Sequence, residues 1–298
     1  LLLILVLIPG IGKSVNGARR WLNLGVTYVQ VTEFVKIAVV IGAAAFTVKR
    51  QEYMHSFTKG FAPMFVVMGI TSSLIGLQPD LGATVVVLMI AMGVLFLGGL
   101  DKRIFTVVFL LAFALGVLMI YLSPWRLERM ISYTDVWAYA QGKGYQLSHS
   151  LIAFGRGELW GVGLGASVEK LHYLPEAHTD FILSVIAEEL GFVGVFVILF
   201  AFYSICFYWL VRRAFEIGRQ AVRLEKVFSG LVAQGVGVWI GVQVFINGGV
   251  VTGLLPTKGL TLPLISYGGS SLLATMVGIA LLLRVDRENR ILMRGGIV

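Results

Sequence analysis

One histidine and four carboxylates lie at the head of a long apolar run, in the segment YLPEAHTDFILSVIAEELG at 173–191. These polar residues are Glu176, His178, Asp180, Glu188 and Glu189. Charged groups within or beside the hydrocarbon layer are costly unless they face a wet cavity or a partner. Asp180, Ser184 and Glu188 recur at every fourth residue, so a helix would place them along one face. This segment is therefore the first candidate for a functional site.

Two further segments place charges inside or beside apolar runs. Glu33 and Lys36 are three residues apart and can pair on one face of a helix, either to dock that helix or to line a polar cavity. In QPDLG at 78–82, a tight turn accounts for the proline and the glycine. Asp80 of the same turn can also line the cavity.

A broken segment near the end of the chain, GLLPTKGLTLPLISYGGSS at 253–271, holds two prolines and four glycines. Irregular backbone at the membrane edge is tolerated where it lines protein or a wet cavity. Lys258, Ser266, Tyr267 and Ser270 are therefore interpreted as donors for an anionic headgroup. An ordinary connecting loop is the alternative.

The glycine-rich stretches do not indicate a nucleotide site. A Walker loop needs a glycine five residues before its Gly-Lys pair, and in GIGKS at 10–14 that position is Leu7. The glycines of FGRGELWGVGLG at 154–165 instead predict tight turns and close backbone packing. The four histidines show no metal-ligand spacing. No cofactor is assigned, although a loosely held Mg²⁺ or Mn²⁺ near the carboxylates stays open.

The composition indicates an integral membrane protein. Hydrophobic residues make up 57% of the 298 residues, charged residues 13%, and the mean hydropathy is +0.87, whereas soluble domains are roughly one-quarter charged. The net charge of +8 does not indicate a nucleic-acid partner, because the basic residues lie in short segments between apolar runs. Cys206, the single cysteine, is expected to be a buried structural thiol.

Seven apolar runs are long enough to cross a hydrocarbon core of roughly 30 Å. They lie near 31–48, 61–77, 83–100, 104–122, 190–211, 227–247 and 267–284, and 1–9 is interpreted as the tail of an eighth. We therefore expect an all-α, polytopic helical membrane protein with one transmembrane domain over 1–298. Because the chain opens on LLLILVLI without a Met or a basic leader, we also expect the N-terminus to be truncated.

Lysine and arginine orient these spans, since short connections rich in both belong in the cytoplasm. The rule puts the C-terminus inside and the segments 10–30, 78–82, 123–178 and 248–266 outside. The polar motifs collect on that outer side. The large loop at 123–178 is rich in aromatic residues and poor in Pro and Ser, so we expect it to pack at the interface.

The stretch 179–213 must bend, because a single helix of that length would overshoot the membrane by about 20 Å. We expect a short amphipathic helix over 179–190, a turn or kink at Gly191 and Gly194, and then the span proper.

The start of that short helix would be capped by Thr179 or His178. Asp180 would then lie in the first turn, where the positive end of the helix dipole favours a carboxylate.

Six motifs together resemble the SEDS family, the FtsW and RodA glycosyltransferases of bacterial wall synthesis. They are NGARRWL at 16–22, QPDLG at 78–82, GYQLSHSLIAFGRGELWGVGLG at 144–165, LPEAHTDFI at 174–182, AEELG at 187–191 and PTKGLTLPLISYGGSSLL at 256–273. The resemblance covers essentially the whole chain. LPEAHTDF and PTKGLTLPLISYGGSS resemble the division branch, FtsW, of Gram-negative bacteria more than the elongation branch, RodA.

The resemblance implies ten helices, of which about eight are represented here, and an enzyme that polymerises lipid II into glycan strands for septal wall synthesis. It implies a multi-pass protein of the bacterial inner membrane at the division septum, with its active site on the periplasmic side. Its partners would be a class B penicillin-binding protein and other divisome membrane proteins.

The catalytic aspartate of the family matches Asp180. A positioned carboxylate that removes the proton of a sugar hydroxyl can contribute roughly 10²–10⁴-fold, so Asp180 is expected to be the general base of an inverting transfer. Cations are needed to offset the leaving pyrophosphate. The substrate-binding candidates are Lys258, Arg19, Arg20 and Lys36 for that charge, and Asn16, Glu33, Asp80, Glu176, His178 and Ser266 as orienting or binding groups.

Other function classes were weighed against this one. A lipid II flippase could use a similar cavity of buried charges, but it would also have to open on the cytoplasmic face. A channel or ion-coupled transporter would usually show inverted repeats and broken helices near the midplane, and neither is found. A membrane scaffold for the penicillin-binding protein is a further alternative.

Overall fold

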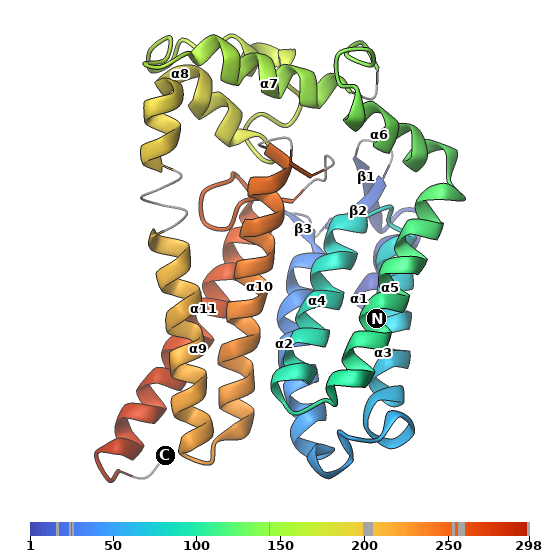
Figure 1. Cartoon of the computed structure of the whole chain (residues 1–298), viewed down its shortest axis with the longest axis vertical. Coiled ribbons are helices and arrows are strands. Elements are labelled where there is room, and N and C mark those ends of the chain that lie inside the picture. Colours follow the sequence, from blue (N-terminus) through green and yellow to red (C-terminus); the bar gives the residue numbers. More distant parts are fainter. Residues whose placement is uncertain are drawn as a thin grey trace. The chain divides into compact units, whose positions relative to one another are not determined.

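The computed structural model of the chain describes residues 1–15, 18–23, 25, 27–142, 144–198, 205–251, 254–255 and 260–296 (Figure 1). Its elements are α1 (Leu2–Leu7), β1 (Gly12–Val15), β2 (Ala18–Asn23), β3 (Tyr28–Gln30), α2 (Val31–Lys49), η1 (Gln51–Tyr53), η2 (Phe57–Phe61), α3 (Ala62–Gly76), α4 (Leu81–Leu97), α5 (Lys102–Tyr121), α6 (Pro124–Thr134), α7 (Tyr145–Gly157), η3 (Glu169–Tyr173), α8 (Ile182–Val197), α9 (Tyr208–Arg223), α10 (Val227–Val251) and α11 (Gly269–Met293).

Five helical segments within the described residues are long and apolar enough to cross a membrane. They are Val31–Lys49, Phe57–Gly76, Lys102–Tyr121, Val227–Val250 and Gly269–Met293, and α4 is a shorter apolar helix of 17 residues. Each corresponds to a span expected from the sequence. The expected span 190–211 lies partly outside the described residues, between the end of α8 and the start of α9.

The chain folds into two compact units. The first comprises Leu1–Thr106, Trp209–Val242 and Gly268–Val298, and the second comprises Val107–Tyr208 and Gln243–Tyr267.

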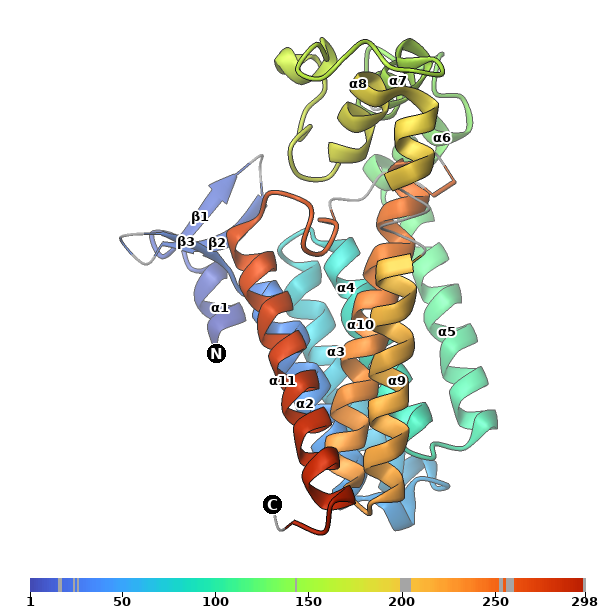
Figure 2. The same cartoon turned by 90° about the vertical axis from the view of Figure 1, so that its left-hand side faces the viewer.

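The helices of the first unit approach one another closely at small residues. An added Cβ on Gly93 of α4 would lie 3.0 Å from the side chain of Val238 in α10, and one on Gly278 of α11 would lie 2.9 Å from Trp239. Transmembrane helices associate through such small residues because lipid offers them no hydrophobic driving force. In Figures 1 and 2, α9, α10 and α11 lie side by side.

Two helices of this unit extend beyond the expected ends of their spans. The sequence predicted ends at residues 211 and 284, but α9 continues to Arg223 and α11 to Met293. Ala214, Ile217 and Ala221 form a buried stripe on α9 that packs on Leu282 and Val285 of α11.

Polar contacts hold the same two helices together. The buried Asn289 donates to the carbonyl of Ile217 at 3.0 Å, and Arg213 pairs with Asp286 at 3.0 Å. The expectation of a loop after residue 211 was wrong because an apolar stripe continues through the charged sequence.

A three-stranded antiparallel sheet, in the order β1-β2-β3, lies in the expected outer segment 10–30. The all-α expectation did not include it. Leu22 of β2 is buried in a cluster with Leu3, Val31 and Ile75. The sheet thus covers the ends of α1, α2 and α3.

The second unit contains the expected large outer loop, which is largely ordered into helices. It holds α6, α7 and the turn η3, and α7 packs against α8. Cys206, which the sequence predicted to be buried, is exposed. In a membrane helix an exposed thiol can lie among lipid chains, so apolar neighbours in sequence did not require burial in protein.

Candidate active site

Asp180 lies in a tight turn directly before α8. The carbonyl of Glu176 accepts hydrogen bonds from the backbone N–H groups of Thr179, Asp180 and Phe181 at 3.2, 3.1 and 3.2 Å. Thr179 also donates its hydroxyl to the Glu176 carboxylate at 2.7 Å. Glu176 itself has a φ of 59°, in the left-handed region. Glu176 therefore organises the turn that presents the half-buried Asp180.

This turn corrects the expected start of the helix. The sequence predicted a cap at Thr179 or His178 with Asp180 in the first turn, but α8 begins at Ile182 with Phe181 at its N-cap and no side-chain cap. The physical reason is competition: the N–H groups that would start a helix at 179 are bound by the Glu176 carbonyl. Asp180 thus precedes the helix.

Apolar side chains hold the underside of the turn. Leu174, Ala177 and Phe181 form a buried cluster against which Val185 of α8 packs. These three buried residues lie within eight positions of the chain, and their packing holds the turn in place. A side chain on such a loop can be held in one geometry, which is what a general base requires.

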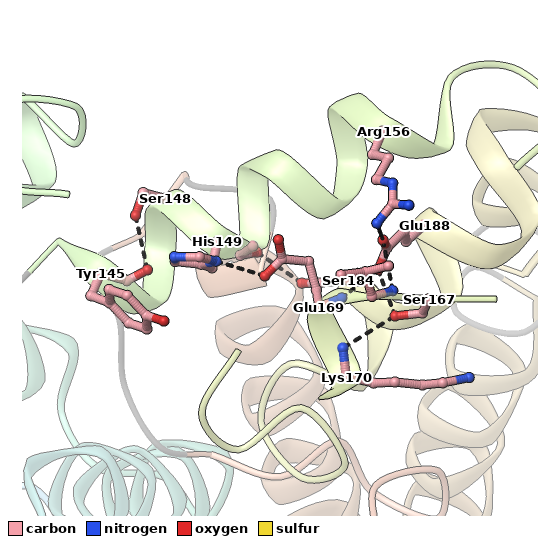
Figure 3. A network of polar contacts seen from close by, with 11 residues as sticks. Tyr145, Ser148, His149, Arg156, Ser167, Glu169, Lys170, Ser184 and Glu188 are labelled. Atoms are coloured by element: carbon pink, nitrogen blue, oxygen red, sulfur yellow. Dashed lines mark hydrogen bonds and ion pairs between the residues drawn. The ribbon is translucent and has the colours of Figure 1, made fainter. Parts of the chain in front are cut away.

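Glu188 is the centre of a buried polar network (Figure 3). Its side chain is fully buried in α8, and its carboxylate accepts from Arg156 Nη1 at 2.9 Å, from the Ser167 hydroxyl, and from the backbone N–H groups of Val168 and Glu169 at 3.0 and 3.2 Å. One turn earlier, Ser184 bonds Ser150 of α7 at 2.8 Å. Asp180 precedes the helix, so only Ser184 and Glu188 of the expected face lie on α8. That face contacts α7 and the segment 167–169.

Gly191 breaks α8 as expected, with φ 66° and ψ −171°. Four backbone groups of α8 beside the break have partners in the 158–163 loop. From the loop, the backbone N–H groups of Val162 and Gly163 donate to the carbonyls of Glu188 and Glu189, each at 3.0 Å. In the other direction, the N–H groups of Phe192 and Val193 donate to the carbonyls of Glu158 and Leu159 at 2.7 and 3.0 Å. The 158–163 loop therefore supplies the partners that a continuous helix would have provided.

The glycines of the 154–165 motif make this contact possible. A Cβ on Gly157 would lie 2.0 Å from the carbonyl oxygen of Ala187, and one on Gly161 would lie 2.1 Å from that of Glu189. The predicted close backbone packing is confirmed.

A histidine–carboxylate hydrogen bond and an ion pair flank this network. His149 Nδ1 lies 2.6 Å from Glu169 Oε2, and Lys170 pairs with Glu189. Partial burial raises the pKa of the Glu189 carboxyl, but the hydrogen bond and the charge of Lys170 outweigh it, so the pKa lies below its usual range. Glu189 is thus a surface partner of the loop, unlike the buried Glu188.

In the first unit, Glu33 and Lys36 form the predicted pair. Lys36 Nζ lies 2.8 Å from Glu33 Oε1, both side chains are buried, and the ammonium also lies 5.5 Å from the ring centroid of Trp239. Within the described part of the chain, Glu33 Oε2 has no hydrogen-bond partner. The pair therefore docks α2 on α10 while one buried carboxylate oxygen is left for another donor.

Arg20 and Asp80 build the turn between α3 and α4. Arg20 donates to the carbonyls of Gln78 and Pro79 at 3.1 and 2.7 Å, and Asp80 caps α4 by accepting from the Ala83 N–H at 3.0 Å. Burial raises the pKa of the Asp80 carboxyl above its usual range, although the positive charge of Arg20 opposes the shift. The turn expected at 78–82 is confirmed, with Asp80 as its helix cap.

The remaining predicted site residues are distributed as follows. Arg19 is exposed and reaches the Leu7 carbonyl at 3.5 Å, and His178 is exposed. Ser266 donates its one proton to the carbonyl of Thr179 at 2.6 Å, so in this structure it holds backbone beside Asp180. Asn16 and Lys258 lie outside the described residues. No group of three or more His, Cys, Asp or Glu side chains among the described residues could hold a metal ion.

Sequence reasoning missed the partners of Glu188 and the backbone role of Ser266. The glycines of the 154–165 motif were the available signal for the first, because they showed that a backbone must approach closely there. A contact between residues 87 positions apart left no signal in spacing or periodicity.

These features define a polytopic helical membrane protein in which a hydrogen-bonded turn before α8 carries a half-buried carboxylate. A family model described as cell cycle protein FtsW/RodA/SpoVE matches residues 1–291. The chain belongs to this family, which confirms the resemblance found in the sequence.

Named relatives cover nearly all of this chain. It is 61% identical over 296 residues to a protein of Burkholderia thailandensis and 58% identical over 298 residues to one of Polynucleobacter necessarius, both named "Probable peptidoglycan glycosyltransferase FtsW". Both alignments include 99% of this chain. The chain spans 63% of the length of the first relative and 69% of the second.

Solved structures share the fold. A chain of a peptidoglycan synthase complex that coordinates polymerization and crosslinking is 32% identical, with a TM-score of 0.75 over 97% of this chain and 78% of that chain. The rod shape determining protein RodA of Thermus thermophilus is 29% identical, with a TM-score of 0.60 over 97% of this chain and 75% of that protein.

Proposed function

We propose that this chain is the catalytic membrane portion of a peptidoglycan glycosyltransferase, which polymerises lipid II into glycan strands during septal wall synthesis in cell division. The observation that carries the proposal is the 61% identity over 99% of the chain to a protein named for this activity. The geometry supports it, because Asp180 is held on a turn with its backbone and its underside both fixed.

In the proposed reaction, Asp180 removes the proton of the GlcNAc 4-hydroxyl of an acceptor lipid II. The hydroxyl oxygen attacks C1 of the MurNAc at the end of the donor strand, and a C1–O bond forms. The bond from C1 to the pyrophosphate oxygen breaks, undecaprenyl pyrophosphate leaves from the opposite face, and the anomeric carbon is inverted. A positioned base can supply roughly 10²–10⁴-fold of the rate.

The leaving pyrophosphate requires cationic partners. Among the described candidates, Arg19 is the most accessible, since it is exposed and makes one long contact to Leu7. Arg20 uses two of its five N–H groups on the turn at 78–79 and keeps the others for a ligand. Lys36 is paired with Glu33, so its role would be to orient.

The protein is a multi-pass membrane protein, as its apolar helices and its family show. We assign it to the bacterial inner membrane at the division septum, with the Asp180 turn on the periplasmic side, because the Lys- and Arg-rich connections lie on the other side. The structural similarity to a chain of a peptidoglycan synthase complex supports a class B penicillin-binding protein as partner, together with other divisome membrane proteins.

The test is reconstitution of the full-length protein with its cognate transpeptidase and lipid II, followed by gel separation of the glycan strands. Wild type should give ladders and Asp180→Asn none. Asp135→Asn is a matched control, because Asp135 is an exposed carboxylate of the same unit whose contact to the Ala138 N–H an amide oxygen can keep.

The alternatives predict other results. Ladders of equal strength from wild type and Asp180→Asn would remove Asp180 from the chemistry. If neither wild type nor Asp180→Asn gave ladders and lipid II crossed vesicle membranes, the results would support a flippase. If the inactive Asp180→Asn variant still binds its transpeptidase, a role as scaffold alone is excluded.

A further inference from the structure

The peptide group that joins Thr179 to Asp180 is held at both of its polar atoms. Its oxygen accepts from the Ser266 hydroxyl at 2.6 Å, and its N–H donates to the Glu176 carbonyl at 3.1 Å. One residue earlier, the His178 carbonyl accepts from the Tyr267 N–H at 3.1 Å. With both ends of a peptide plane bound, its rotation is blocked, and this fixes the direction in which the Asp180 side chain leaves the backbone.

Ser266 is itself rigidly placed. Its hydroxyl accepts from the Leu262 N–H at 2.8 Å, and its own N–H donates to the Leu262 carbonyl at 3.0 Å. The hydroxyl therefore has a fixed acceptor for its one proton and a fixed donor to its oxygen. A side chain whose hydrogen bonds are so specified has a defined rotamer.

The loop that carries Ser266 is tied to α10. The buried amides of Asn247 and Gln243 donate to the carbonyls of Leu260 and Thr261 at 2.6 and 2.9 Å. Leu264 adopts a φ of 65°, in the left-handed region that disfavours a leucine. Such a backbone persists where the surroundings over-determine it, as the hydrogen bonds on both sides do here.

We propose that Ser266 is a positioning residue for Asp180, acting through the carbonyl of Thr179. In this proposal the loop 260–267 connects the Asp180 turn to α10 and holds the turn in place. The inference rests on the proposed function, in which Asp180 is the base. This role replaces the direct substrate contact expected for Ser266 from the sequence. The hydroxyl proton that would bind a headgroup is donated to the Thr179 carbonyl instead.

The two roles separate in kinetics. A residue that aligns the base acts on the chemical step, so its loss lowers kcat and leaves the KM for lipid II nearly unchanged. A residue that binds the headgroup equally in the ground and transition states would raise KM. A misplacement of about 1 Å can cost roughly 10²-fold.

The experiment compares Ser266→Ala, Ser266→Thr and Ser148→Ala in the full-length protein with its transpeptidase. Ser148 is a matched control, since it is a buried serine of the same unit that donates to a backbone carbonyl, that of Tyr145, within α7. We expect Ser266→Ala to lower kcat about 10–100-fold with KM within about 2-fold of wild type. Ser266→Thr, which keeps the hydroxyl, and Ser148→Ala should stay within about 3-fold.

Amide hydrogen exchange of the peptide covering residues 177–182 gives a second readout that does not depend on activity. It should quicken in Ser266→Ala and stay at the wild-type rate in Ser148→Ala and Ser266→Thr. If Asp180→Asn proved active, the proposed function would fail, yet this exchange measurement would still report whether Ser266 holds the turn.

Three results would overturn the inference. A raised KM with unchanged kcat in Ser266→Ala would make Ser266 a substrate contact. Loss of activity in Ser266→Thr equal to that in Ser266→Ala would show that the hydroxyl is not what matters. Unchanged exchange over 177–182 in Ser266→Ala would show that the turn does not depend on it.

Discussion

Arg156 Nη1 lies 2.9 Å from Glu188 Oε1, which joins the end of α7 to a fully buried carboxylate in α8. Arg156 keeps 43% of its side chain exposed while Glu188 keeps none. The remaining donors to Glu188 are the Ser167 hydroxyl and two backbone N–H groups. The Glu188 side chain thus accepts hydrogen bonds from two backbone N–H groups of the loop that precedes the Asp180 turn.

Glu188→Gln should lower the free energy of unfolding by about 1–3 kcal/mol. Each oxygen of Glu188 accepts a backbone N–H, so an amide NH₂ in either position would face a donor. The measurement is denaturant-induced unfolding of the purified protein. Glu189→Gln is the control and should cost less, because Glu189 pairs with Lys170 nearer the surface. Equal losses would show that the full burial of Glu188 adds nothing, because backbone N–H groups of Gly165 and Ser167 also bind Glu189.

Gly191→Ala should be severely destabilising, by more than about 4 kcal/mol. Its backbone conformation is one that only glycine adopts readily. A Cβ there would also lie 2.3 Å from the Gly161 nitrogen. Gly155→Ala lies in the last turn of α7, where an added Cβ would meet no described atom within 4 Å, and it should be neutral or stabilising by up to about 1 kcal/mol. Thermal melting of both variants checks this, and a mild Gly191→Ala would contradict the close contact.

The Glu33 and Lys36 pair should behave as a unit. Lys36→Met leaves a buried carboxylate without its cation and should cost about 3–5 kcal/mol, whereas the double variant Glu33→Gln/Lys36→Met should recover much of that loss. A double-mutant cycle on unfolding in detergent measures the coupling. Additive losses would show that the two charges do not depend on each other.

The Lys170–Glu189 pair should make stability depend on acid pH. Because the folded-state pKa of Glu189 is lowered from its usual value of 4.5, its contribution is complete above that value and is lost as the pH falls through the folded pKa. Melting temperature followed from pH 6 to 3 should therefore fall less steeply in Glu189→Gln than in wild type. Parallel curves would assign the acid loss to other carboxylates.

Periodicity and composition predicted the features that depend on local sequence. The span expected over 31–48 is α2, the Glu33 and Lys36 pair forms at its three-residue spacing, and the helix after Asp180 breaks at Gly191. In each case the determinant lies within one turn of the residue concerned. Whether Asp180 is the base stays a prediction.

Features that depend on distant residues were missed. Thr179 looked like a helix cap, but its N–H and hydroxyl are bound by Glu176 and its carbonyl by Ser266. The charged sequence after residue 211 looked like a loop, yet its alanine stripe packs on α11. Such competition is decided by tertiary contacts, which spacing alone does not report.

The exchange of backbone partners around Gly191 has a consequence for engineering. The 158–163 loop acts as a splint for α8, and the two segments exchange hydrogen bonds in both directions. They can therefore be transplanted only together. A chimera that takes α8 from one relative should also take residues 155–165 from the same parent, and a graft of either segment alone would leave the bend in α8 without these hydrogen-bond partners.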